Sequence, residues 1–425
     1  MIDFQALRNK ILDKAIRGEL VLQLESEPEV AKNRTEIDKV PFEIPKKWEW
    51  YHLGEVIDYG KVEQVGSSFV ADNTWVLDLE DIEKNTGRIL TKKRGLVSTS
   101  NKNIFKKGWV LYSKLRPYLN KVVIADEDGL CTTEIVPINT DEAKIPLIAG
   151  YLQAYLMSTY FLSYASQVAH GVKMPRIGTK DAKIALIPIP PIEEQSRIVQ
   201  KISNSFKQIQ FVSEIYSELN ILSDNLRQQV LLRAIQGRLV PQLESEPEVT
   251  SIVELSEDPP FSIPEKWKWT CLKNVTTLIS GRDLEKSQIV ESPGGIPYIT
   301  GASQIQDETI IVNRWTKSPA VFSELGDVLL TCKGTVGKIA INNVGRIHIA
   351  RQIMAIRSSG KVDTEYLKYF LTFYSKSLAS NAKSMIPGID RKTVLKMPIP
   401  IPPLTEQHRI VEKISWLFSQ LKIIC

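Results

Sequence analysis

The chain contains one half-unit twice, and this internal repeat constrains its fold more than any other feature of the sequence. The segment LRNKILDKAIRGELVLQLESEPEV at residues 7–30 returns as LRQQVLLRAIQGRLVPQLESEPEV at residues 226–249, with 16 of 24 positions identical. A second pair, PIPPIEEQSRIVQKIS at 188–203 and PIPPLTEQHRIVEKIS at 400–415, shares 12 of 16 positions. The half-units agree at their edges and diverge inside. We therefore expect two equivalent frames that carry different interiors.

A long amphipathic helix is predicted over residues 192–236, which contain neither proline nor glycine and repeat apolar residues in steps of three and four. Gly237 is a natural stop for this helix. Its first part resembles residues 404–425 and its last part resembles residues 2–17, so the C-terminus followed by the N-terminus would form a second copy. We predict two antiparallel helical rods in a pseudo-twofold coiled coil. The alternative is a duplicated core helix with no role in spacing. The predicted seam residues are Ile198, Ile202, Phe206, Ile209, Leu219, Leu226, Ile410 and Ile414.

The two interiors indicate an α+β fold, because short β-rich runs alternate with turns and each interior closes with a helical stretch, at 146–169 and at 363–380. The acidic LESEPEV segment after each helix is predicted to be a solvated linker. The chain thus divides into an N-terminal helix and linker (1–30), a first interior domain (31–190), a central helix and linker (191–250), a second interior domain (251–402) and a C-terminal helix (403–425).

Composition limits the functional classes. A net charge of +5 permits a nucleic-acid partner but requires any basic patch to be local. The four cysteines form no CxxC pair, so we expect neither a metal site nor a disulfide framework, and a reducing cytoplasm fits. No signal peptide is evident and no uninterrupted apolar stretch approaches 18 residues, so a membrane partner is not expected.

Basic and planar side chains cluster on turns inside both interiors, where they suit phosphate neutralisation and the reading of base edges. Each cluster taken alone is more typical of a solvated surface. The duplicated layout favours nucleic-acid binding. The predicted DNA-binding residues are Lys114, Arg116, Asn120, Lys173 and Arg176 in the first interior, and Gln304, Lys333, Lys338, Arg351, Gln352 and Arg391 in the second.

Catalytic signatures are weak. The tetrapeptide DPPF at residues 258–261 is used by amino-group DNA methyltransferases, but the matching first block lacks the acid and no glycine-rich cofactor fingerprint stands nearby. The basic loop 333–338 lacks the residues that a phosphate loop requires. We therefore expect no catalytic residues and no cofactor. A stand-alone adenine DNA methyltransferase and a coiled-coil scaffold that never touches DNA remain as alternative hypotheses.

The repeated flanks PIPPIEEQSRIV and PIPPLTEQHRIV, together with the two IP-x-K-W-x-W segments, resemble the specificity (S) subunit of type I restriction–modification systems. The blocks YSKLRPYLNKV and GDVLLTCKGTVGKIAI resemble parts of its target recognition domains. The resemblance implies that each interior reads one half of a bipartite, asymmetric DNA target, and that the helices set the spacing. It further implies docking of two methyltransferase subunits on the helices, association with restriction subunits, and no catalysis by this chain.

Overall fold

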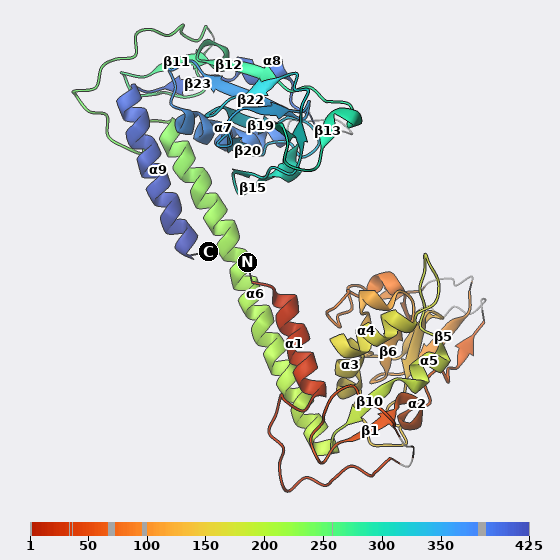
Figure 1. Cartoon of the computed structure of the whole chain (residues 1–425). Helices are drawn as coiled ribbons and strands as arrows, with labels where there is room; N and C mark the ends of the chain where they lie inside the picture. Colours follow the sequence, from red (N-terminus) through yellow and green to blue (C-terminus); the bar gives the residue numbers. More distant parts are fainter. Residues whose placement is uncertain are drawn as a thin grey trace. The chain divides into compact units, whose positions relative to one another are not determined.

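The computed structural model describes residues 2–33, 35, 37–66, 73–95, 100–256, 258–380 and 388–424, with the side chains of residues 376–380 and 422–424 left aside. The chain forms two compact units, Met1–Ile215 and Tyr216–Cys425 (Figure 1). Within the described ranges, no helix is both long enough and apolar enough to cross a bilayer.

One uninterrupted helix, α6 (Ile192–Ile235), contributes its first part to unit 1 and its last part to unit 2 (Figure 1). The sequence predicted this helix over residues 192–236. Its 44 residues correspond to a length of about 66 Å at the usual rise per residue. Beyond its end, Gly237 takes a left-handed φ of 68°, and Gly18 does the same with 73° after α1 (Phe4–Ile16). Glycine terminates both helices because it adopts this conformation without a Cβ clash.

Among its described residues, unit 1 combines three small sheets with short helices. Its strands are β1 (Glu49–His52), β2 (Gln64–Val65), β3 (Trp75–Leu77), β4 (Lys93–Arg94), β5 (Lys102–Phe105), β6 (Val110–Ser113), β7 (Val122–Ile124), β8 (Gly129–Thr132), β9 (Ile135–Ile138) and β10 (Leu186–Ile189). They form sheets of order β2-β5-β8-β3-β4, β7-β6-β9 and β1-β10, in which β3 and β8 run parallel. Its helical elements besides α1 and α6 are α2 (Leu53–Val56), η1 (Leu79–Asp81), η2 (Pro117–Leu119), α3 (Ala149–Met157), α4 (Thr159–Val168) and α5 (Thr179–Ile184).

Strand β6 separates two cores in unit 1 because its side chains alternate between its faces. Val110 and Tyr112 pack with α3, α4, α1 and α6, whereas Leu111 packs with Trp75 and Phe105 of the five-stranded sheet. All four strand positions are buried, and the first three are the large side chains Val110, Leu111 and Tyr112. Outside α1 and α6, unit 1 is layered in the order helices, three-stranded sheet, five-stranded sheet.

Unit 2 repeats this layering with other residues. Its strands are β11 (Lys268–Cys271), β12 (Thr276–Ser280), β13 (Ile289–Val290), β14 (Ile296–Ile299), β15 (Ile305–Gln306), β16 (Thr309–Ile310), β17 (Trp315–Thr316), β18 (Phe322–Ser323), β19 (Val328–Thr331), β20 (Ile339–Ile341), β21 (Ile347–Ile349), β22 (Ile353–Ser358) and β23 (Pro398–Ile401). Its helical elements are η3 (Leu272–Asn274), η4 (Lys286–Gln288), η5 (Ala302–Gln304), α7 (Thr364–Ser380), α8 (Arg391–Lys396) and α9 (Leu404–Ile424). The sheets have the orders β12-β22-β19-β20, β13-β17-β14-β21-β18, β11-β23 and β15-β16. Leu329 and its two neighbours on β19 alternate between the cores as β6 does.

The helical stretch predicted at 146–169 is two helices. Ser158 ends α3 and begins α4, with an extended ψ of 154°, and its side chain accepts a hydrogen bond from Phe161 N at 3.2 Å. Asp13 of α1 also caps α4, because its carboxylate accepts from Thr159 N and Oγ1 at 2.9 and 2.7 Å. The break is a capping effect that apolar periodicity does not reveal.

Each unit pairs α6 with a second, antiparallel helix. In unit 1 the Arg8 guanidinium of α1 lies 5.2 Å from the Phe206 ring of α6. Leu12, one turn later in α1, belongs to the same apolar cluster as Ile202, one turn earlier in α6. In unit 2 the Arg227 guanidinium of α6 lies 5.1 Å from the Phe418 ring of α9. Arg8 and Arg227, like the two phenylalanines, are equivalent positions of the repeat.

The predicted seam is buried near the ends of α6 and α9. Ile198, Ile202, Ile410 and Ile414 are buried, and Phe206, Ile209 and Leu219 are partly buried. Leu226 departs from the predicted seam, because this residue is 44% exposed. It lies about 100° around the helix from Arg227, and α9 packs on the side of Arg227 and Leu231.

The LESEPEV segments are not free solvated linkers. Glu27 and Glu246, which are equivalent positions in the two copies, are buried and form ion pairs with Arg197 and Arg409. The sequence prediction failed here because a charged, proline-containing segment can still be fixed when each copy supplies an arginine from a neighbouring helix.

Candidate nucleic-acid interface

A β-hairpin stands at the same place in both units and carries several of the predicted DNA-binding residues. The first hairpin joins β6 to β7 through residues 114–121, and the second joins β19 to β20 through residues 332–338. A segment that follows α4 in unit 1 and α7 in unit 2 pairs with the hairpin. Leu115 bridges to Arg176 in unit 1, and Lys333 bridges to Gly388 in unit 2.

The first hairpin requires two left-handed residues. Arg116 and Asn120 both have a φ of 48°, a conformation that is costly for residues with a Cβ. The second hairpin places Gly334 and Gly337 at its two left-handed positions, with φ of 74° and 91°. Both hairpins thus contain two left-handed residues, which are glycines in one unit and polar residues in the other.

Arg116 and Asn120 have different roles. The Asn120 side chain is buried and donates to Met157 O at 3.0 Å, so it holds the hairpin to α3. The backbone N–H of Arg116 donates to Pro175 O at 2.7 Å, and its Nε is buried without a hydrogen-bond partner among the described residues. Arg116 is partly exposed beside the pairing segment.

The structure brings Lys114, Arg116, Lys173 and Arg176 together from two separate segments, and we call this set the first hairpin surface. Lys173 and Arg176 are exposed. Arg176 forms a forked ion pair with Glu134, with Nε–Oε2 at 2.9 Å and Nη2–Oε1 at 3.1 Å. The hydrogen bond and charge of Glu134 raise the pKa of Arg176, so this side chain stays cationic.

Apolar side chains that the sequence analysis did not select also lie on these segments. Tyr118, Val172 and Met174 are exposed, and Val172 is fully so. Tyr118 sits in the hairpin and the other two flank Lys173. An aromatic or thioether side chain between cations provides contact area for base edges or sugars. The sequence signal was the alternation of these residues with Lys and Arg in a turn.

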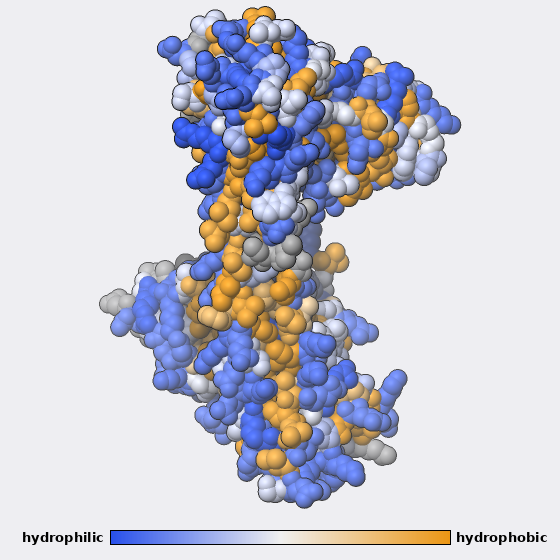
Figure 2. All heavy atoms as spheres, turned by 90° about the vertical axis from the view of Figure 1, so that its left-hand side faces the viewer, coloured by the Kyte–Doolittle hydropathy of each residue, from blue (hydrophilic) through white to orange (hydrophobic). Residues whose placement is uncertain are grey.

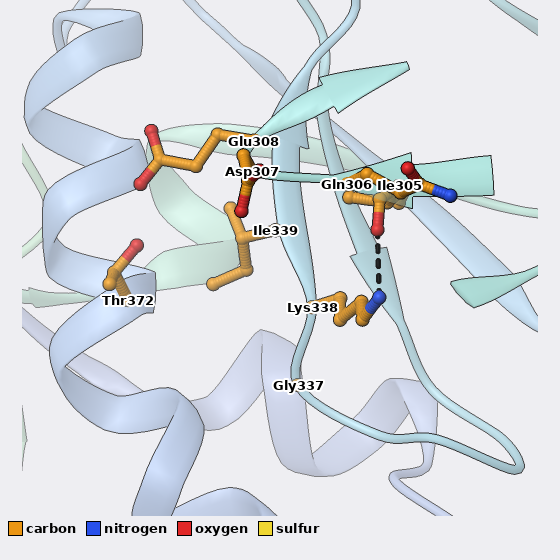
Figure 3. A pocket seen from close by; sticks show the side chains of 8 residues that line it. All are labelled: Ile305, Gln306, Asp307, Glu308, Gly337, Lys338, Ile339 and Thr372. Atoms are coloured by element: carbon orange, nitrogen blue, oxygen red, sulfur yellow. Dashed lines mark hydrogen bonds between the residues drawn. The ribbon is translucent and has the colours of Figure 1, made fainter. Parts of the chain in front are cut away.

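Two residues predicted to contact DNA in unit 2 have side chains that form hydrogen bonds within the fold. The Lys338 ammonium donates to the carbonyl of Ala302 at 3.0 Å. It also donates to the carbonyl of Ile305 at 2.8 Å (Figure 3). In the first hairpin, the Lys121 ammonium donates to Leu79 O at 2.5 Å. Gln304 is buried, where it accepts from Thr300 and donates to Tyr298 O at 3.1 Å. We therefore leave Asn120, Gln304 and Lys338 out of the proposed interface.

The remaining unit 2 residues are linked through Cys332. Cys332 N donates to Gln352 O at 2.8 Å, and Ile389 N donates to Cys332 O at 2.9 Å, two residues before Arg391. Lys333, Arg351, Gln352 and Arg391 are exposed, and we call them the second hairpin surface. Arg351 pairs with Asp283 at 2.7 Å, as Arg176 does with Glu134.

Nothing in the described part of the chain groups three or more His, Cys, Asp or Glu side chains in a way that could hold a metal ion. The DPPF segment has a structural role. The Phe261 ring packs edge-on against Trp269 with centroids 4.8 Å apart, and Phe42 packs on Trp50 at 4.9 Å in the equivalent position. In both units, the phenylalanine thus packs where the linker meets the first strand of the following domain.

The sequence matches the family described as Type I restriction modification DNA specificity domain over residues 45–220 and 264–424. Both matched regions begin at the junction and end within a helix of the repeat. The chain belongs to this family of DNA specificity subunits. This is a non-catalytic class of subunit, and the resemblance noted in the sequence is confirmed.

Individual relatives agree with this assignment. The EcoDI specificity subunit of Escherichia coli is 31% identical over 205 residues, which cover 48% of this chain and 45% of that subunit. The EcoBI specificity subunit of Escherichia coli is 24% identical over 330 residues, 71% of this chain and 65% of the relative. The chain thus aligns with about half to two thirds of the length of these two relatives. A putative MjaX specificity subunit of Methanocaldococcus jannaschii is 21% identical over 95% of this chain and 93% of its own length.

Solved structures show the same architecture. A chain from a study of complex assembly and conformational transition of the type I restriction–modification system superposes with a TM-score of 0.72 at 25% identity. The match covers 90% of this chain and 93% of that one. The HsdS subunit of Thermoanaerobacter tengcongensis shares the fold, with a TM-score of 0.52 and 24% identity over 91% of this chain and 94% of its own.

Proposed function

We propose that this chain is the sequence-recognition subunit of a type I restriction–modification complex, and that each unit reads one half of a bipartite, asymmetric DNA target. The observation that carries the proposal is one hairpin-centred surface built twice on matching frames with different exposed side chains. The first surface offers Lys114, Arg116, Lys173 and Arg176, and the second offers Lys333, Arg351, Gln352 and Arg391. Equivalent frames would place the surfaces on DNA alike, while their different donors would select different bases.

The helices are proposed to space the two half-sites and to dock the methyltransferase subunits. Exposed apolar side chains on α6 support docking in both units. Phe211 is 64% exposed in unit 1, and Leu222 is 54% exposed in unit 2. Large apolar side chains left in water on a helix are typical of a binding face. Figure 2 shows apolar side chains along the helices. Two equivalent helix pairs would bind two copies of one partner.

Catalysis would then come from partner subunits. The methyltransferase subunits would modify the DNA, restriction subunits would join a larger complex, and the complex would act on double-stranded DNA in the cytoplasm. The chain itself would need no cofactor.

Mapping of methylated positions tests this function directly. The chain is expressed with its methyltransferase partner in cells that lack other modification enzymes, and the methylated sites are sequenced. We expect a split motif with two different halves and a fixed gap. A contiguous motif, or no modification while the complex is assembled, would contradict the proposal.

Two further measurements address the alternatives. Titration of the isolated chain with S-adenosylmethionine should show no binding, whereas a stand-alone methyltransferase would bind it. The assembled complex should bind duplex DNA with an affinity that falls as salt rises, which a pure protein scaffold would not do.

A further inference from the structure

A repeated tetrapeptide, EQxR, stands near the start of α6 and of α9 but contributes nothing to either hairpin surface. It consists of Glu194, Gln195 and Arg197 in unit 1, and Glu406, Gln407 and Arg409 in unit 2. The four Glu and Gln side chains are completely buried. Buried polar side chains on a helix need partners, and here each of the three binds a different part of its own unit.

We call residues 48–190 of unit 1 and 267–402 of unit 2 the recognition lobes. The glutamate connects the helix to the first residue of its lobe. Trp48 Nε1 donates to Glu194 Oε2 at 2.9 Å, and Trp267 Nε1 donates to Glu406 Oε2 at the same distance. Each tryptophan directly precedes the first strand pair of its lobe, β1 with β10 or β11 with β23.

The glutamine connects the same helix to the helical layer of the lobe. Gln195 Oε1 accepts from Ile148 N at 2.8 Å, at the start of α3, and its Nε2 donates to Pro146 O and Pro190 O. Gln407 Oε1 accepts from Asp363 N at 2.6 Å, at the start of α7, and its Nε2 also donates to two carbonyls.

The arginine fastens the linker that returns from the preceding helix. Arg197 forms a fork with buried Glu27, with Nε–Oε1 at 3.0 Å and Nη2–Oε2 at 2.7 Å, and donates to Leu22 O at 2.9 Å. Arg409 repeats the fork with Glu246 at 3.1 and 2.8 Å and donates to Pro241 O at 3.0 Å. A forked arginine–carboxylate pair restricts direction as well as distance.

We propose that the two EQxR clusters are positioning residues for DNA recognition, which hold each lobe at one angle on its helix and so restrict the gap between half-sites that the complex accepts. The glutamate and the glutamine hold the lobe at two different points, and the arginine holds the linker that leads into it, so together the three contacts restrict the orientation of the lobe. A helix alone fixes a length but leaves the lobe at its end free to tilt. Since adjacent base pairs lie about 3.4 Å apart, a tilt of a few ångströms would admit a neighbouring gap length.

This inference rests on the proposed bipartite function, and its test begins from the mapped target. The assembled complex is offered a DNA library in which the gap between the half-sites varies by up to about two base pairs, and methylation at each gap is sequenced. The main variant is Glu27→Gln with Arg197→Met, which opens the fork without leaving a buried charge unpaired. The double variant Glu246→Gln with Arg409→Met repeats the test in unit 2. Lys201→Met, an exposed position one turn further along α6, is the control.

Wild type and control should methylate one gap length. The double variants should raise methylation at neighbouring gaps, relative to the preferred gap, by at least about tenfold while the base preference within each half-site stays unchanged. If the double variants do not fold, Arg197→Lys and Arg409→Lys, which keep the charge and lose the fork, are judged by the same ratio.

Unchanged gap selectivity in variants with lowered melting temperatures would overturn the inference and leave EQxR as a simple anchor. Absence of a split motif in wild type would instead overturn the proposed function itself, so the two failures are distinguishable.

Discussion

At the scale of single residues, the two hairpins show how left-handed turn positions are filled by different residues in the two units. Both turns need two left-handed residues, and unit 2 meets the need with Gly334 and Gly337. Unit 1 uses Arg116 and Asn120, at a cost of about 1 kcal/mol or more each. The buried hydrogen bond of Asn120 to Met157 O offsets its cost. The backbone N–H of Arg116 bonds Pro175 O, but its side-chain Nε has no hydrogen-bond partner among the described residues, which favours a role at the surface.

Replacing the ion-paired arginines of the two surfaces should weaken specific DNA binding. Arg176→Ala and Arg351→Ala each remove a cation and leave Glu134 or Asp283 to repel phosphate. We expect a loss of about 1–3 kcal/mol for the mapped target, with partner docking intact. Fluorescence anisotropy of labelled duplex with the assembled complex measures the affinity. Arg346→Ala, which breaks the Glu324 ion pair on another loop, is the control, and unchanged affinity and selectivity in both variants would remove the assignment.

The buried carboxylates of unit 2 should give opposite contributions to the pH dependence of stability. Burial raises the pKa of Glu406, and the Trp267 hydrogen bond offsets this only in part. Burial acts on Glu246 as well, but hydrogen bonds from Arg409 and Leu243 N–H bring its pKa below the usual 4.5. Glu406 therefore adds stability at low pH that is lost as pH rises through its raised pKa. Glu246 adds stability above about pH 4.5 that is lost as pH falls through its lowered pKa.

Glu406→Gln isolates the first of these contributions, because the amide oxygen still accepts from Trp267. The variant should be at least as stable as wild type at pH 7, and its unfolding free energy should change less between pH 7 and pH 5. Urea denaturation followed by circular dichroism at both pH values measures this. An unchanged pH dependence would show that Glu406 does not titrate differently in the folded chain.

At the scale of elements, the two helix pairs carry the part of the fold that periodicity predicts best. Ile202 and Ile414 were placed in the seam from spacing alone, and both are buried. Leu226 has the same spacing but faces water, because α9 covers the side of α6 that bears Arg227. Spacing identifies an apolar helix face, whereas the packing direction of the partner helix decides which part of that face is covered.

Aspartate substitutions test this difference. Ile202→Asp and Ile414→Asp should each destabilise their unit by several kcal/mol, about 3 or more, because a carboxylate would replace a buried side chain in the helix contact. Leu226→Asp should change stability by only about 0.5 kcal/mol. Thermal melting followed by circular dichroism compares the three. Equal melting temperatures for Ile202→Asp, Ile414→Asp and wild type would mean that the seam is misplaced.

At the scale of the whole molecule, the chain is two units with equivalent frames joined by one helix. Each frame has its own EQxR cluster, linker, helix pair and hairpin. The exposed apolar side chains of α6 matter for assembly with other subunits and not for the stability of either unit.

Serine substitutions on α6 should therefore affect assembly alone. Phe211→Ser in unit 1 and Leu222→Ser in unit 2 should each weaken binding of a methyltransferase subunit by at least about tenfold, since each removes roughly 1.4 kcal/mol or more of apolar contact. Melting temperatures should stay at the wild-type value. Analytical ultracentrifugation of mixtures with the partner measures the binding, and full assembly of the double variant would exclude α6 as the docking face.

The sequence by itself determined the repeat, the long helix, the α+β class of the interiors and the family, because each of these is written in local spacing or in residue identity. Only the tertiary structure decided which of the selected side chains have their polar groups occupied within the fold. Asn120, Gln304 and Lys338 have the chemistry of base or phosphate readers, but backbone carbonyls of their own units accept hydrogen bonds from their side chains. Glu27 and Glu246 looked like solvated charges until the arginines of the helices were placed beside them. A polar side chain's role depends on which partner lies within about 3 Å, and local sequence does not encode that distance.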